Sequence, residues 1–258
     1  MSVAIHVSHE AAAKIGGIGS VLNGLVSSPS YRTRFSRTLI YGPLFSLEGP
    51  EKNRLGENSR LLYSSLDGVT PSPWRERFAP LEEKYGLRFV YGIRKMGNEF
   101  SPEESVETEI LLCDVRGVKR SAIDTLKFTL WESFALPCDR FGDWDFEQYL
   151  RLSVPYVEVT EALFGSEPCV HFAHEYMGVP CALAIEREKS LRRRLADRTF
   201  FYAHEISPAR ACVESHPGHD TLFYNLLLLD RREGRSLEER FGSQENSYRS
   251  QLVKRAVH

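Results

Sequence analysis

A glycine-rich turn near the N-terminus constrains the fold of this chain more than any other stretch. Residues 11–20 follow a short apolar run at 3–7 and precede an apolar segment at 21–26, an order that predicts strand, turn and helix. Glycine lets the backbone approach a ligand closely, and the free N–H groups of the following helix point back at the turn. Lys14 adds a positive charge. The stretch is therefore a candidate seat for a phosphate or diphosphate.

The turn matches neither of the two commonest phosphate-binding loops. The dinucleotide fingerprint G-x-G-x-x-G would need a third glycine after Gly17 and Gly19, at the position that Leu22 occupies. The P-loop places its lysine after the last glycine, whereas Lys14 precedes them all. A tight strand-to-helix turn with a solvated lysine is the alternative, and the turn alone favours neither interpretation.

Composition narrows the class of protein. The 258 residues suffice for one large α/β domain or two small ones, and a net charge of -2 gives no case for a nucleic-acid or membrane partner. No apolar run is long enough to span a bilayer, and no signal peptide is evident.

Five scattered cysteines without C-x-x-C spacing indicate reduced thiols. The basic cluster at 192–194 is interleaved with acids and is expected to be a solvated helix face. We expect a cytoplasmic protein.

Strand-like and helix-like segments alternate along the chain. This alternation predicts an α/β fold with a doubly wound, mostly parallel, Rossmann-like sheet. Residues 46–80, rich in Gly, Pro, Ser and Asn, are expected to be surface loops around a short helix near 74–78. The expected strands are 3–7, 38–41, 87–91, 110–115, 169–172 and 199–203, and the expected helices are 21–26, 122–131, 147–152, 156–164, 181–195, one that opens at Ser207, 220–229 and 252–258.

The dipeptide His-Glu occurs three times, each time just beyond a predicted strand. In an open parallel sheet the carboxyl ends of the strands line the ligand crevice. We therefore expect these pairs and the glycine-rich turn to converge at one edge of the sheet, which is typical of a binding site. The three pairs are His9-Glu10, His174-Glu175 and His204-Glu205.

A metal site is considered and set aside. The H-E-x-x-H spacing is absent, and no histidine pair lies at i and i+4 of an expected helix. We expect neither a metal nor a cofactor. His9 and His171 are interpreted as strand-end residues that hydrogen-bond to backbone, whereas His174 and His204 are assigned a binding role because both precede loop-to-helix turns.

Three motifs, taken in order, resemble the N-terminal domain of glycogen and starch synthases, which are glycosyltransferases of the GT-B architecture. Residues 13–19 resemble the K-x-G-G-L loop, with Ile18 in place of leucine. Residues 171–176 are similar to H-F-H-E-W, with one extra residue and a tyrosine in place of tryptophan. Residues 201–210 resemble the F-T-T-H-A-T-L-L-G-R stretch of the animal and fungal branch.

The resemblance implies retaining transfer of glucose from a nucleoside-diphosphate glucose (ADP- or UDP-glucose) to a glucan or oligosaccharide acceptor, without a metal ion. Departures at Ala173, Tyr176 and Glu205 leave the donor and acceptor open. Carried onto matching positions, the resemblance places Lys14 at the donor phosphates, the backbone of Gly16 and Gly17 near the sugar and diphosphate, His174 at the transferred sugar as the catalytic residue, and Glu175, His204 and Arg210 along the crevice.

The resemblance also implies a domain organisation. Residues 1–258 correspond to the acceptor-side N-terminal domain, and the nucleotide-binding C-terminal domain has no counterpart here, so we expect a truncated product that does not turn over alone. One alternative is a non-catalytic carbohydrate-binding module of the same fold, with Trp74, Trp144 and Tyr176 as exposed aromatic residues. A third interpretation is an NAD-dependent enzyme. It is disfavoured because the dinucleotide fingerprint is missing and because residues 41–43, which end the second strand, include no acidic residue to bind the ribose.

Overall fold

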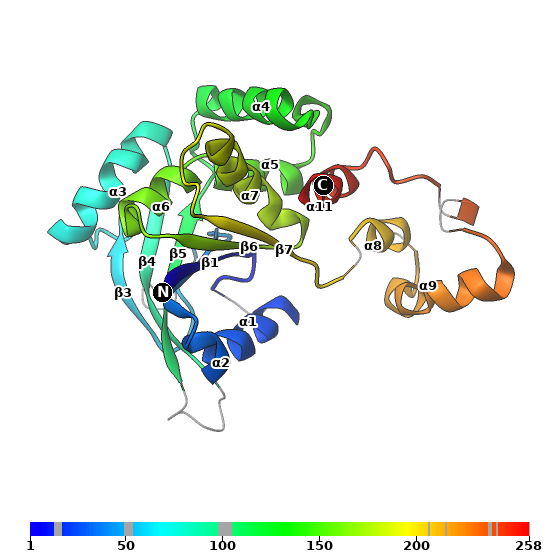
Figure 1. Ribbon diagram of the computed structural model, residues 1–258, viewed down its shortest axis with the longest axis horizontal. Coiled ribbons are helices and arrows are strands. Elements are labelled where there is room, and N and C mark those ends of the chain that lie inside the picture. Colours follow the sequence, from blue (N-terminus) through cyan, green and yellow to red (C-terminus); the bar gives the residue numbers. More distant parts are fainter. Residues whose placement is uncertain are drawn as a thin grey trace.

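A twisted sheet with the strand order β3-β4-β5-β2-β1-β6-β7 forms the centre of the described part of the chain (Figure 1). The computed structural model describes residues 1–12, 17–48, 54–97, 105–205, 207–214, 216–236, 239–240 and 242–257. Its strands are β1 (Ser2–Val7), β2 (Phe35–Pro43), β3 (Ser59–Ser64), β4 (Arg88–Met96), β5 (Val106–Asp114), β6 (Cys169–His174) and β7 (Arg198–Tyr202).

The pairing confirms the predicted α/β class and the mostly parallel sheet. β1 pairs in parallel with β2 and with β6, and the parallel region continues through β5 on one side and β7 on the other. Among the seven described strands, only the pairings of β4 with β3 and with β5 are antiparallel. The central strands are buried on both faces, as their nearly continuous apolar runs predict.

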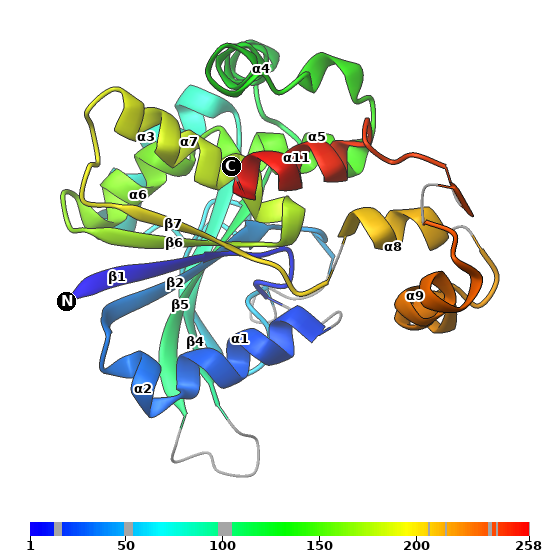
Figure 2. The same ribbon diagram turned by 45° about the vertical axis from the view of Figure 1, so that its right-hand side comes forward.

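Helices cover both faces of the sheet (Figure 2). One face carries α1 (Gly17–Ser27) and α2 (Pro29–Arg32), whereas α8 (Ser207–Val213) and α9 (His219–Glu233) extend beyond the carboxyl end of the sheet. The other face carries α3 (Ser72–Tyr85), α4 (Arg120–Phe134), α5 (Trp144–Ser153), α6 (Tyr156–Phe164), α7 (Glu175–Ser190) and α11 (Tyr248–Val257), with a short 3₁₀ turn, η3 (Cys138–Arg140), after α4.

No helix among the described residues is both long enough and apolar enough to span a bilayer.

Within residues 46–80, the short helix expected near 74–78 is present but longer, as part of α3, whereas the expectation of a loop at 59–64 is wrong. β3 is an edge strand paired with β4, and α3 buries Phe78 and Leu81. Pro80 inside the helix and the proline-rich entry at 71–73 masked its amphipathic pattern. Burial of the aromatic side chains therefore overrides weak local propensity.

The helix predicted at 181–195 in fact begins at Glu175 and ends at Ser190. Gly178 and Pro180 lower the helical propensity of its first half. Gly178 is required by close packing, because a Cβ there would lie 2.6 Å from the Cα of Ala173 on β6. This close approach lets the chain turn directly from strand into helix.

Candidate functional site

A cavity of about 930 Å³ opens at the carboxyl ends of β1, β6 and β7. This volume is within the range of pockets that hold a small ligand. The predicted convergence of the three His-Glu pairs is confirmed with one exception, since His174 is absent from the lining. Lys14 and Gly16 lie outside the described residues, and Gly17 lines the cavity at the start of α1.

Glu10 occupies the N-terminus of α1. Its Oε2 accepts the N–H of Gly19 at 2.8 Å, and its side chain is 2% exposed. The Nε2 of the neighbouring His9 lies 3.5 Å from Oε1 of the same carboxylate. A carboxylate is favourable here because the first N–H groups of a helix lack partners and carry partial positive charge. A carboxylate of the protein thus already accepts one of the N–H groups at the start of α1 that were expected to bind a phosphate.

Glu175 anchors the segment that follows β7. Its Oε1 accepts the backbone N–H groups of His204 and Glu205, the latter at 2.8 Å, and its Oε2 accepts the hydroxyl of Ser207. Glu175 has a φ of 56°, in the left-handed region that a glutamate seldom adopts. Strain of this kind persists where the surrounding structure over-determines the residue. Three bonds to one carboxylate supply that constraint, and they position His204 at the cavity.

His174 lies beneath the cavity and is fully buried. Its Nε2 is 2.9 Å from Nδ1 of His6, and its Nδ1 is 2.8 Å from Nε2 of His204. Burial lowers the pKa of His174 to about 2 and that of His6 to about 3, so both rings are neutral near neutral pH. His174 therefore reaches the cavity through His204 rather than by its own side chain.

Arg210 lies on α8 and lines the cavity from the side of α9. Its Nη1 donates to Asp220 at 2.7 Å, and its Nε donates to Glu205 at 3.2 Å. The guanidinium also lies 4.2 Å from the ring centroid of Phe223, a favourable cation–π distance. Arg210 is thus held in place by two acids and an aromatic ring, with its charge largely balanced.

A second group of residues at the cavity comes from distant helices, and the sequence analysis did not bring its members together. Tyr176, expected to be exposed, is buried, and its hydroxyl donates to Asp145 at 2.6 Å. Tyr248 donates to the same carboxylate at 2.8 Å. Arg249 lies 5.2 Å from the ring centroid of Tyr176 and pairs with Glu214 at 3.0 Å. No spacing along the chain brings α5, α7 and α11 together, so this cluster carries no sequence signal.

Acidic side chains outnumber cations among the described lining residues. Hydrogen bonds hold two of these carboxylates to backbone N–H groups, and both lining arginines pair with acids. Carboxylates accept hydrogen bonds from ligand hydroxyl groups, whereas an anionic ligand must be met by the arginines and by α1. The acids are Glu10, Asp145, Glu175, Glu205, Glu214 and Asp220, and the cations are Arg210 and Arg249.

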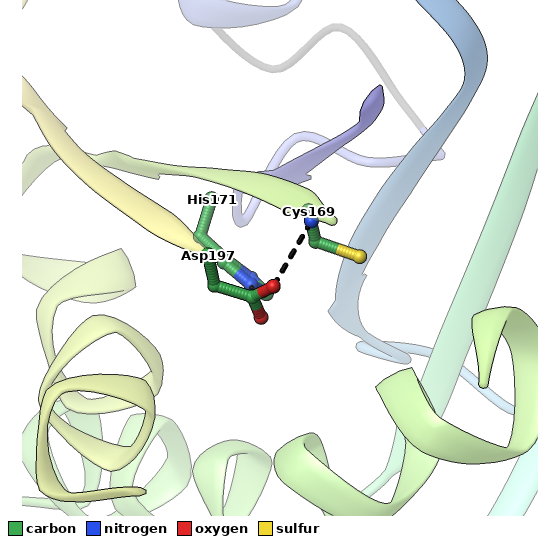
Figure 3. Close-up of side chains that lie close together, drawn as sticks. All are labelled: Cys169, His171 and Asp197. Carbon is green, nitrogen blue, oxygen red and sulfur yellow. Dashed lines mark hydrogen bonds and ion pairs between the residues drawn. The ribbon is translucent and has the colours of Figure 1, made fainter. Parts of the chain in front are cut away.

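Cys169, His171 and Asp197 cluster at the opposite end of the strands from the cavity, in an arrangement that resembles a metal site (Figure 3). Asp197 accepts from the N–H of Cys169 at 3.0 Å and lies 3.0 Å from Nε2 of His171. The Nδ1 of His171 is 2.7 Å from the hydroxyl of Tyr156, and Arg194 donates to Asp197 at 2.5 Å. The Sγ of Cys169 donates to the carbonyl of Glu167 at 3.3 Å. Because protein groups already bond to these ligand atoms, we interpret the cluster as a structural link between β6 and the turn before β7.

Two sequence expectations are wrong at this cluster. His171 bonds to side chains rather than to backbone. Arg194, expected on a solvated helix face, follows the end of α7, and its side chain is 7% exposed in its ion pair with Asp197.

No family model and no curated protein matches this chain. Among solved structures, the chain is similar to the catalytic domain of starch synthase IV from Arabidopsis thaliana bound to ADP and acarbose, with 13% sequence identity and a TM-score of 0.41. The likeness covers 79% of this chain and 33% of that chain, so this chain spans about a third of the length of the structure that it matches.

The buried histidines predict that acid destabilises the fold. The native pKa values of His6 and His174 are about 3 and about 2, whereas histidines of the unfolded chain titrate near about 6.5. Below that pH the unfolded state binds protons that the native state does not, so the free energy of unfolding falls as the pH falls. We expect a loss of about 2 kcal/mol or more between about pH 6 and about pH 5, measured by urea unfolding.

His174→Gln should reduce this dependence on pH, because it removes one of the two fully buried imidazoles. Equal stability of the wild-type chain at the two pH values would contradict the assignment of neutral, buried imidazoles.

Removal of the Glu175 charge should release the segment after β7. Burial lowers the pKa of His204, and Glu175 and Glu10 act to raise it, so Glu175→Gln is expected to lower that pKa further. The amides of His204 and Glu205 should also exchange about tenfold faster or more, because each loses a charge-assisted bond. NMR titration and hydrogen exchange measure the two effects. The matched control is Glu188→Gln, on the same helix, and identical behaviour of the two variants would show that Glu175 has no anchoring role.

Proposed function

We propose that this chain forms the acceptor-side half of a retaining glycosyltransferase of the glycogen- and starch-synthase kind. One observation carries the proposal. The stretches whose motifs resemble that family are far apart in the sequence, and described residues from all of them, Gly17, Glu175 and Arg210 among them, line one cavity. The reaction would transfer glucose from a nucleoside-diphosphate glucose to a glucan or related acceptor, with retention.

The proposed chemistry centres on the departing diphosphate. As the bond between glucose and diphosphate breaks, negative charge grows on the leaving group, and preorganised N–H donors and cations stabilise that charge most effectively. The N-terminus of α1 and the guanidinium of Arg210 are placed for this role in the proposal, together with Lys14. Arginine supplies a planar fork that matches two phosphate oxygens. The pairing of Arg210 with Glu205 and Asp220 holds that fork at the cavity.

The structure supports a changed role for one residue of the proposed site. His174 is fully buried, so we propose that it supports His204 rather than contacting the transferred sugar. His204 lines the cavity and is the imidazole that we propose as the contact for the ligand. The carboxylates of the lining would accept hydrogen bonds from sugar hydroxyls. The nucleotide base is assigned to a second domain, which the family resemblance implies.

The acidic lining favours a second candidate, a non-catalytic module that binds a carbohydrate. A neutral sugar meets no repulsion from carboxylates, and aromatic rings of Tyr149 and Phe223 face the same cavity. The exposed aromatic surface expected for such a module is smaller than the sequence suggested. Trp144 is 49% exposed, but Trp74 is half-buried and its ring centroid lies 4.6 Å from that of Tyr91.

Calorimetric titration of the chain with UDP-glucose, ADP-glucose and a malto-oligosaccharide separates the two functions. A donor site predicts that a nucleotide sugar binds and that Arg210→Gln weakens its binding about tenfold or more, the effect of losing one charge-assisted bond. The control Arg120→Gln removes an exposed arginine on α4 and should have no effect. Because the acceptor side of a glycosyltransferase would also bind the oligosaccharide, binding of a nucleotide sugar is the outcome that separates the two functions, and its absence would favour the carbohydrate module. Equal effects of the two arginine variants would contradict a phosphate contact by Arg210.

A further inference from the structure

Three imidazoles form a hydrogen-bonded row from the cavity into the protein interior. Nε2 of His204 lies 2.8 Å from Nδ1 of His174, and Nε2 of His174 lies 2.9 Å from Nδ1 of His6. The parallel register explains the row. His6 pairs with Phe172 and His174 pairs with Tyr202, so each histidine is two residues beyond the partner of the preceding one. Such diagonal neighbours share one face of the sheet.

The inner end of the row is a pair of hydroxyl groups. Nε2 of His6 lies 2.8 Å from the hydroxyl of Tyr31, which in turn lies 3.2 Å from Oγ1 of Thr38 on β2. Aromatic rings hold the imidazoles in place. Phe172 stacks on His6 at 4.6 Å, and Tyr202 stacks on the other two rings at 5.2 and 4.7 Å.

The geometry couples the protonation of the three rings. Each contact between two imidazole nitrogens needs one N–H and one lone pair, since a neutral ring protonates only one nitrogen. If His204 carries its proton on Nε2, then His174 and His6 must do so too, and Tyr31 accepts from His6 and donates to Thr38. If instead Tyr31 donates to His6, all three rings carry the proton on Nδ1. The row therefore has two neutral arrangements, and in each the three rings are the same tautomer.

We propose that His6 and Tyr31 are positioning residues that set, through His174, the tautomer of His204 at the cavity. The Nδ1 of His204 takes no part in the row and belongs to a side chain that lines the cavity. In one arrangement this nitrogen offers a lone pair, and in the other it offers an N–H. The row thus determines whether His204 accepts a hydrogen bond from a ligand hydroxyl or donates one to a ligand oxygen.

Because His6 and His174 are buried, the coupling changes which nitrogen of each ring carries the proton and does not change the charge of the rings. Charging either inner ring is unfavourable because both are desolvated, and their pKa values lie far below the neutral range. Among the described residues, the charged and aromatic groups that face His204 from outside the row are Glu175, Glu10, His9 and Tyr202. None of these four belongs to the inner end of the row, so the described contacts connect Thr38 to His204 along the imidazoles.

The test is the tautomer of each histidine, read from long-range proton–nitrogen NMR spectra of the chain labelled with ¹⁵N-histidine at about pH 7.5, where the row is neutral. In the wild-type chain, His6, His174 and His204 should show the same tautomer. Thr38→Val leaves the Tyr31 hydroxyl only His6 as its acceptor, so all three rings should shift toward the Nδ1-protonated form. The expected shift is about fivefold, the ratio that corresponds to one hydrogen bond.

Two further variants make the test specific. Tyr31→Phe removes the hydroxyl that connects Thr38 to His6, so Thr38→Val should have no effect on His204 when added to it. Tyr41→Phe is the control, because it removes another buried hydroxyl of β2, one that donates to the carbonyl of Leu152 at 2.8 Å outside the row. This control should leave the three tautomers unchanged.

Different tautomers among the three rings of the wild-type chain would overturn the proposal. So would an unchanged His204 in Thr38→Val, or a shift of His204 by Thr38→Val that persists without the Tyr31 hydroxyl. No ligand is needed for these measurements, so their outcome is independent of whether the glycosyltransferase proposal holds.

Discussion

The parallel pairing of β1, β6 and β7 is the constraint on which the rest of the site depends. Parallel strands end at the same edge, so residues that follow them meet although they are far apart along the chain. The same register places His6, His174 and His204 on one diagonal. A slip of one residue would move each histidine to the opposite face of the sheet and dismantle both the row and the cavity.

Buried polar groups hold the loops at this edge, and each is matched by partners. Glu10 bonds to the start of α1, and Glu175 bonds to three groups of the segment after β7. Buried carboxylates are costly unless donors surround them, so the loops and the acids stabilise one another. Two of the three His-Glu pairs thus use their glutamates to hold the loops, whereas His204 of the third pair lines the cavity together with Arg210.

The fold was largely predictable from sequence because long apolar strands and helices carry strong periodic signals. The convergence of the His-Glu pairs was predictable for the same reason, since it follows from topology alone. Contacts between distant helices were not, as Asp145 and Arg249 show. His6 was overlooked because it stands in an apolar run, although a lone histidine in a buried strand is itself a signal of a polar partner. The depth of His174 depends on packing that no motif records.

The central claim is that the cavity at the carboxyl edge binds the ligand, and amide NMR during titration with UDP-glucose tests it most directly. The account predicts that the largest shifts occur at Gly17 and Gly19 of α1, at His204 and along α8. A second cavity, of about 630 Å³, lies on another face and is lined by residues of α3, α4, α6 and α7, including Thr125 and Glu158. Shifts centred there, or spread evenly over the surface, would contradict the account.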